Sequence, residues 1–362
     1  MIIPLLLIIS MIFTPQITLP YQETQWSDLS KDTTHIIGCS IDKYTIQLGV
    51  FALQQQSIKL VLSVQEQTPE IEKLHDCIAD FIEHIRNKYD LSLEYLCIAI
   101  SGTTQPKRDW IQSPHFAQPI YAGEIARKTH LQKIIIVNDF EIIGYGIPFV
   151  ESSNIVTLNK GKVLPGEPQA IIGAGAGLGT SFMVWNKQEN SYLTLPLALN
   201  FTPFTPLDEQ EFEYFNFLRT QQPENHVGWG TVLGSKGGLP SIYRFLKGNS
   251  DENTLDTNTI FAQARAHEPL SEQAVKFYLK LYARAIRILI YFVLPYNGVY
   301  ITNRVALDNL DFITDPAFTK EIFTTQNSYL ENIIRDIPVY VISDPKIHMY
   351  GAAGYLARKL AP

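Results

Sequence analysis

The chain has 362 residues, of which 46% are hydrophobic and 18% are charged, and its formal net charge is -7. This composition predicts a globular protein with a substantial core, and the length favours two domains over one. The sequence lacks a long Lys/Arg run that could follow a phosphate backbone, which argues against nucleic acid as a partner. Cys39, Cys77 and Cys97 are too few and too scattered for a disulfide framework or a zinc site, and they predict buried thiols in a reduced compartment.

The chain begins with an apolar stretch, MIIPLLLIISMIFTP, at residues 1–15. Its length is that of a signal-peptide core and is short for a bilayer span, but it lacks a preceding Lys or Arg and a small-residue cleavage site. We expect residues 1–34 to be an extension outside the fold and any membrane contact to be confined to this stretch. We expect a cytoplasmic protein, with export as the alternative.

From residue 35 onward the hydrophobic pattern is typical of an α/β protein. Residues 36–40, 45–51 and 59–64 predict three antiparallel strands, and apolar residues at helical spacing predict a helix over 71–85. A strand over 96–102, a short helix over 123–129 and a strand over 134–137 follow. This order predicts that part of the sheet is parallel.

A second α/β unit begins near residue 150. Strands are predicted at 170–172 and 180–185 on either side of a glycine run, a central helix over 275–293, strands at 298–302 and 338–342, and a closing helix over 350–360. A strand follows the glycine run where a dinucleotide-binding fold requires a helix, which argues against that fold.

Two motifs suggest chemistry. Asn138 and Asp139 follow four consecutive β-branched residues, at the end of a strand expected to be covered on both faces, where open α/β sheets bind ligands. Asp139 is therefore a candidate general base, with a simple polar turn as the alternative.

The second motif is the glycine run, with Gly173, Gly175, Gly177 and Gly179 around Ala176. We expect these glycines to adopt positive φ and to present amide N–H groups to an anion; an ordinary tight hairpin is the alternative. Together the two motifs suggest phosphoryl transfer.

The runs IVNDFEIIGYGIP, GAGAGLGTSF, TLPLALNFTPFTP, VLGSKGGLPSIYR, NGVYITN and IPVYVISD occur in this order. In this respect the chain, from about residue 36 to 360, resembles the bacterial glucokinase family of the hexokinase/actin-like ATPase superfamily. The resemblance implies an α/β, two-domain sugar-kinase (actin-like ATPase, ribonuclease H-like) fold with mixed sheets and an interdomain cleft. Residues 35–149 plus 346–362 would form the small domain and residues 150–345 the large one.

The resemblance also implies a reaction, the ATP-dependent phosphorylation of glucose to glucose 6-phosphate. Asp139 would accept the proton of the sugar 6-hydroxyl, Asn138 would bind the sugar, and the glycine run would bind the nucleotide phosphates. ATP and Mg are the implied cofactors, sugar and nucleotide the implied partners, and a homodimer is allowed. The ligands of the metal are not identified.

Several positions depart from the family pattern. Where the family has a phosphate and magnesium loop, Asp-x-Gly-Gly-Thr, this chain has residues 39–44, in which Asp42 and Lys43 are expected to form a solvated hairpin tip. The turn Ala-Gly-Gly, which gives the purine a bare backbone, is replaced by Thr302, Asn303 and Arg304.

In the sugar-binding segments, the family's Glu, His and second Glu fall on Ala198, Phe201 and Gly230. Glu211 is not expected to replace them, because its surroundings, DEQEFEYF, are typical of a solvated helix start. We therefore expect glucose phosphorylation to be lost or much reduced, and whether the chain is an enzyme stays open. The alternatives are a non-catalytic binding or interaction protein and a kinase with a less polar acceptor.

Overall fold

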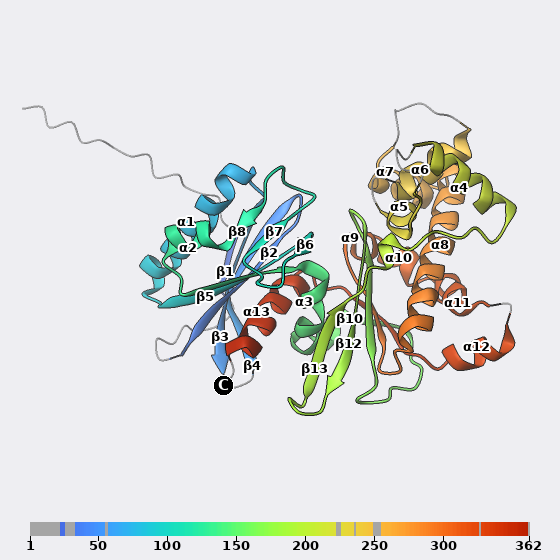
Figure 1. Cartoon of the computed structure of the whole chain (residues 1–362). Helices are drawn as coiled ribbons and strands as arrows, with labels where there is room; N and C mark the ends of the chain where they lie inside the picture. The colour runs from blue at the N-terminus through green and yellow to red at the C-terminus, as the bar shows by residue number, and fades with distance from the viewer. Residues whose placement is uncertain are drawn as a thin grey trace, which may run out of the picture.

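The computed structural model describes residues 22–25, 33–54, 57–221, 226–234, 237–248, 255–325 and 327–360, and it contains two six-stranded mixed sheets (Figure 1). The first sheet has the spatial order β1 (Gln22–Gln25), β4 (Ser57–Gln67), β3 (Thr45–Gln54), β2 (His35–Ile41), β5 (Leu93–Ile100), β9 (Lys133–Asn138). The hairpins are antiparallel, and β2, β5 and β9 are parallel, as the sequence predicts.

One face of the first sheet is covered by α1 (Ile71–Tyr89) and α2 (Ala122–Thr129). The apolar residues of α1 recur at helical spacing, so one side of the helix can be buried against the strands. A small antiparallel sheet, β6 (Thr103–Thr104), β7 (Trp110–Gln112) and β8 (Ile120–Tyr121), lies in the connection between β5 and α2.

The second sheet has the spatial order β10 (Ile155–Asn159), β15 (Val339–Ile342), β14 (Val299–Ile301), β11 (Gln169–Ala174), β12 (Leu178–Asn186), β13 (Ser191–Pro196). Strands β15, β14 and β11 are parallel, and the glycine run joins β11 to β12 in the predicted hairpin.

The helices that remain within residues 147–334 lie mostly in the second half of the chain. They are η1 (Ile147–Phe149), η2 (Ser152–Asn154), η3 (Leu199–Phe201), α4 (Glu209–Gln221), α5 (Trp229–Leu233), α6 (Gly238–Lys247), α7 (Thr257–Arg265), α8 (Pro269–Val293), α9 (Arg304–Asp308), α10 (Leu310–Ile313), α11 (Pro316–Phe323) and α12 (Ser328–Ile334). Helix α8 is the central one, as predicted: it is buried on most sides and packs against β11 and several of these helices.

Helices α3 (Asp139–Gly146) and α13 (Ile347–Leu360) lie between the two sheets (Figure 1). Helix α13 packs against β2 and β5, α3 packs against β12 and β13, and the two helices pack against each other. Side chains from both sheets join the same buried cluster around these helices. The resulting order is helices, sheet, α3 with α13, sheet, helices.

The described structure differs from expectation at the N-terminus. Residues 22–25 belong to the segment expected to lie outside the fold, yet they form strand β1 at the edge of the first sheet. The segment QETQ is entirely polar, so its sequence carries no hydrophobic signal for a strand, and its backbone pairs antiparallel with β4. Residues 1–21 lie outside the described residues. In the described part of the chain, no helix is long and apolar enough to cross a membrane.

Removal of residues 1–31 should cost little stability, because β1 contributes only a four-residue edge ladder. We expect a loss of about 1–2 kcal/mol, which corresponds to a fall in melting temperature of roughly 2–8 °C. Calorimetry or circular dichroism would measure it, and a chain shortened by residues 1–21 isolates the contribution of β1. A much larger loss would show that β1 is integral to the core.

Candidate active site

The end of β9 and the start of α3 carry the candidate base. Asn138 is the N-cap of α3: its Oδ1 accepts hydrogen bonds from the N–H groups of Phe140 (2.9 Å) and Glu141 (3.3 Å). Its Nδ2 donates to the carbonyl of Gly102 (2.9 Å), just beyond the neighbouring parallel strand β5. Asn138 therefore links the ends of two strands and begins a helix. The alternative of a simple polar turn did not include this helix.

Asp139 is the first residue of α3 and is half-buried. Burial raises the pKa of its carboxyl from 3.8 to about 6, although a hydrogen bond from the Phe140 N–H (3.1 Å) opposes the shift. The negative charge of Asp42 adds to the increase in this pKa. A carboxylate that titrates just below neutrality suits a general base.

Asp42 forms the tip of the β2–β3 hairpin. Its Oδ1 accepts from the N–H groups of Tyr44 (2.6 Å) and Thr45 (2.7 Å), and its Oδ2 accepts from Thr45 Oγ1 (2.9 Å). Lys43 and Tyr44 are exposed. The predicted solvated tip is confirmed, and the Asp42 carboxylate is engaged in shaping the turn.

His348 is a further titratable residue near this site, and the sequence analysis did not identify it. Its ring lies 6.2 Å from that of Phe140, and its Nε2 is buried with no hydrogen-bond partner among the described residues. Burial lowers the pKa of His348 to about 4, against the opposing effect of Asp42, so the imidazole is neutral at pH 7. The predicted closing helix began at residue 350, whereas α13 begins at Ile347.

The glycine run lies against α3, which brings the two sequence motifs together. None of Gly173, Gly175, Gly177 and Gly179 has positive φ, so that expectation is wrong. Two of these glycines are needed for close packing: a Cβ on Gly179 would lie 2.1 Å from the Phe140 ring, and one on Gly173 2.5 Å from the Thr302 carbonyl oxygen.

The tip of this hairpin is less open to an anion than expected. The N–H of Gly175 donates to the carbonyl of Gly177 (2.8 Å), so this amide is already engaged. Ala176 and Gly177 are exposed. Beside the run, the side chain of Asn303 lies against Gly175, and Arg304 is exposed at the start of α9.

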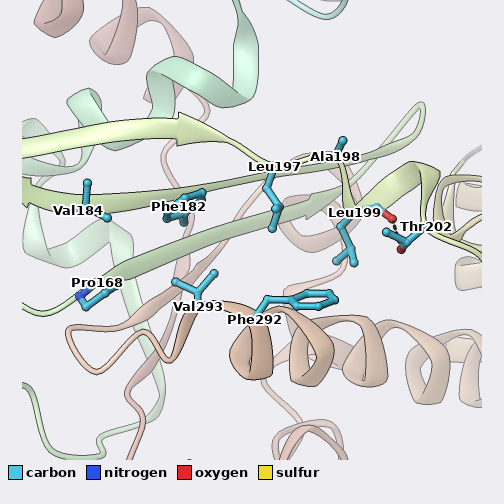
Figure 2. A pocket seen from close by; sticks show the side chains of 9 residues that line it. All are labelled: Pro168, Phe182, Val184, Leu197, Ala198, Leu199, Thr202, Phe292 and Val293. Atoms are coloured by element: carbon cyan, nitrogen blue, oxygen red, sulfur yellow. Dashed lines mark hydrogen bonds between the residues drawn. The ribbon is translucent and has the colours of Figure 1, made fainter.

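The sugar-segment positions offer no polar side chain. Phe201 is 70% exposed, and Gly230 packs against Asn200, whose Cβ would lie 3.1 Å from a Cβ at position 230. Ala198 lines an apolar cavity of about 490 Å³ (Figure 2). The cavity lining consists of Pro168, Phe182, Val184, Leu197, Ala198, Leu199, Thr202, Phe292 and Val293.

This cavity lies on the face of β12 that points away from α3. Phe182 and Val184 point into the cavity, whereas Ser181 donates to the Phe140 carbonyl (2.8 Å) and Met183 packs near Gly144 of α3. Alternate residues of a strand point to opposite faces. The cavity is therefore separated from Asp139 by the sheet. Ala198 lies at the rim of the cavity, and its side chain points away from those of Leu197 and Leu199 (Figure 2).

Glu211 corrects another expectation, because it is fully buried and not part of a solvated helix start. Its Oε2 accepts from Arg284 (2.5 Å), and its Oε1 lies 2.9 Å from Lys280 Nζ. The Arg284 guanidinium lies 4.9 Å from the Phe204 ring and 5.0 Å from the Trp229 ring. Glu211 thus holds the segment after Phe201 in place, and its carboxylate is not free to bind a sugar.

No metal site is evident in the ranges that the structure describes: no group of three or more His, Cys, Asp or Glu side chains there could hold a metal ion. All three cysteines are free and buried, as predicted, and burial raises the pKa of Cys77 to about 12.

Comparison with solved structures supports the predicted fold. A glucokinase from Balamuthia mandrillaris in complex with glucose has a TM-score of 0.76 at 16% identity, covering 90% of this chain and 94% of that one. A ROK family glucokinase from Streptomyces griseus in complex with glucose and AMPPNP has a TM-score of 0.55 at 15% identity, covering 90% and 100%. The fold is thus the two-domain sugar-kinase fold with mixed sheets.

Sequence comparison gives the family. A curated glucokinase from Nostoc punctiforme is 27% identical over 288 residues, which cover 73% of this chain and 82% of the relative. A family model described as Glucokinase matches residues 45–359. The chain belongs to the glucokinase family.

Proposed function

We propose that this glucokinase-like sugar kinase transfers a phosphoryl group from ATP to glucose only slowly, with Asp139 as the base. The observation that carries the proposal is the contrast within the site. Asp139 keeps a half-buried position and a pKa of about 6, whereas Ala198, Phe201 and Gly230 offer a sugar no hydrogen-bonding side chain.

Asp139 would contribute to phosphoryl transfer by accepting one proton. Its carboxylate would accept the proton of the sugar 6-hydroxyl as that oxygen bonds to the γ-phosphorus of ATP. The bond between this phosphorus and the β–γ bridging oxygen breaks in the same transfer, and ADP leaves with that oxygen. Asn138 would contact the sugar through the Nδ2 hydrogen that does not bond to Gly102, while its Oδ1 continues to cap α3.

The sugar contacts determine how weak the reaction is. Loss of one buried hydrogen-bonding partner costs about 1–3 kcal/mol, and each 1.4 kcal/mol is about tenfold in affinity or rate. Three such losses would weaken the use of glucose by several orders of magnitude. Glu211 does not compensate, because it is held by Arg284.

The residues expected to bind the nucleotide phosphates also favour a slow reaction. The Streptomyces griseus neighbour holds AMPPNP, which supports ATP as the donor, with Mg as its expected companion. In this chain, however, the Asp42 carboxylate is engaged by Tyr44 and Thr45, and the Gly175 amide by Gly177. These residues fit a magnesium–phosphate complex poorly, so no catalytic step is assigned through it.

The domain arrangement belongs to the same proposal. Residues 35–149 with 346–362 would move against residues 150–345 to close the cleft over bound sugar. The cytoplasmic location and the homodimer likewise stay predictions. A binding protein without catalysis is the alternative that the following experiments separate.

Glucose phosphorylation should be far slower than about 10 per second, as measured in a coupled assay for glucose 6-phosphate. The triple variant Ala198→Glu, Phe201→His, Gly230→Glu should strengthen glucose binding in calorimetry, because it returns the family's polar groups. A variant with Phe201→Ala alone is the control, since it removes the ring without adding a donor. An ordinary turnover in the wild type would refute the proposal.

Asp139→Asn should lower any measurable turnover about 10²–10⁴-fold, because the amide keeps the shape of the carboxylate but cannot accept the proton. The sugar KM should change far less than kcat. Asp42→Asn serves as a comparison, since Asp42 shapes the hairpin. Equal turnover in wild type and Asp139→Asn would show that Asp139 is not the base and only begins a helix.

The pH dependence of the protein's stability tests the raised pKa of the Asp139 carboxyl without any assay of activity. The folded-state pKa of about 6 lies above the ordinary 3.8, so the folded protein binds this proton more tightly than the unfolded chain does. The associated stability is present below about pH 4 and is lost as the pH rises through about 6. Asp139→Asn should therefore raise the free energy of unfolding in urea at neutral pH and not at pH 4.

The surface carboxyl of Asp256 provides the matched control. Hydrogen bonds from Thr259 lower the pKa of Asp256, so Asp256→Asn should bring no gain at neutral pH. If Asp139→Asn is less stable than wild type at neutral pH, the raised pKa of Asp139 is contradicted.

A further inference from the structure

Asn303 has a backbone conformation that normally belongs to glycine. Its φ is 83° and its ψ is 167°, in a region that is essentially restricted to glycine. The other non-glycine residues of positive φ in the described chain have φ between 47° and 60°, which is the milder left-handed region that Asn and Asp enter readily. The position following β14 therefore keeps a glycine geometry while carrying a side chain.

The Asn303 side chain is fixed in place by two sets of contacts. Its Oδ1 accepts a hydrogen bond from the N–H of Arg304 (2.7 Å). Its amide lies against the glycine run: a Cβ on Gly175 would lie 2.7 Å from Asn303 Nδ2, and a Cβ on Gly173 2.8 Å from Asn303 Cβ. The side chain therefore fills the space that Gly173 and Gly175 of the glycine run leave free.

This space lies at the edge of the sheet that suits a ligand. Strands β11 and β14 are parallel neighbours, with Ile172 opposite Ile301. Their carboxyl ends, which lead into the glycine run and into Asn303, consequently share one edge, where open α/β sheets bind ligands. The hydroxyl oxygen of Thr302 at this edge is buried with no hydrogen-bond partner among the described residues.

We propose that the side chain of Asn303 blocks the nucleotide end of the site and sets the low nucleotide affinity of this chain. The inference rests on the proposed function, because it takes ATP as the ligand of this edge. Removal of the side chain would free the surface of Gly175, whose nearest neighbours all belong to Asn303, and would relieve the backbone conformation in one change.

The test is Asn303→Gly, with binding of ATP–Mg measured by calorimetry and folding by melting temperature. We expect affinity to rise about tenfold or more, with a melting temperature no lower than that of the wild type, because glycine adopts this φ without strain. Asn303→Ala should bind ATP–Mg more tightly than the wild type but melt at a lower temperature, since it removes the amide and keeps the Cβ.

Asn190→Gly is the matched control, because Asn190 also has positive φ, 48°, but lies in the turn between β12 and β13. It should leave ATP–Mg affinity unchanged. Unchanged or weaker binding in Asn303→Gly overturns the proposal, weaker binding identifying Asn303 as a ligand-binding residue. Equal strengthening by Asn190→Gly also overturns it. The proposed function fails separately, on ordinary glucose turnover by the wild type.

Discussion

The close crossing of α3 and α13 is the constraint on which the rest of the structure depends. A Cβ on Gly351 would lie 2.3 Å from the Ile142 carbonyl oxygen, and one on Gly146 2.7 Å from that of Ile347. Glycine is required here because the two backbones touch. Each helix packs on a different sheet, so this contact sets the spacing between the sheets and the position of Asp139 at the start of α3.

The two carboxylates of α3 at this crossing, Glu141 and Asp139, differ in their charged partners. Glu141 of α3 pairs with Arg108, whose guanidinium also lies 5.3 Å from the ring of Tyr355 in α13. Asp139, two residues earlier, has no ion-pair partner among the described residues and faces the field of Asp42. One carboxylate therefore strengthens the joint between the helices, and the other is without an opposite charge, so its ionisation costs the folded state some stability.

The sequence predicts what depends on local pattern and misses what depends on distant partners. The strand before Asn138 follows from four β-branched residues, and the hairpin after Ala174 follows from glycines between apolar runs. Helix α3 was missed because its short, nearly all-apolar sequence has no amphipathic period. The burial of Glu211 could not be predicted, because its partner Arg284 is 73 residues away in the chain. Sites of contact between elements, such as Asn303 against Gly175, are invisible for the same reason.

The position of α13 has a consequence for how the protein acquires its fold during synthesis. This last helix, Ile347–Leu360, covers the face of β2, β3 and β5 that α1 and α2 leave open. The ribosome therefore releases the first sheet long before its second face can be buried, and an unprotected apolar sheet is a hazard for aggregation. The core on this face of the first sheet is complete only when α13 is in place, so a nascent chain that stops short of residue 347 leaves that face uncovered.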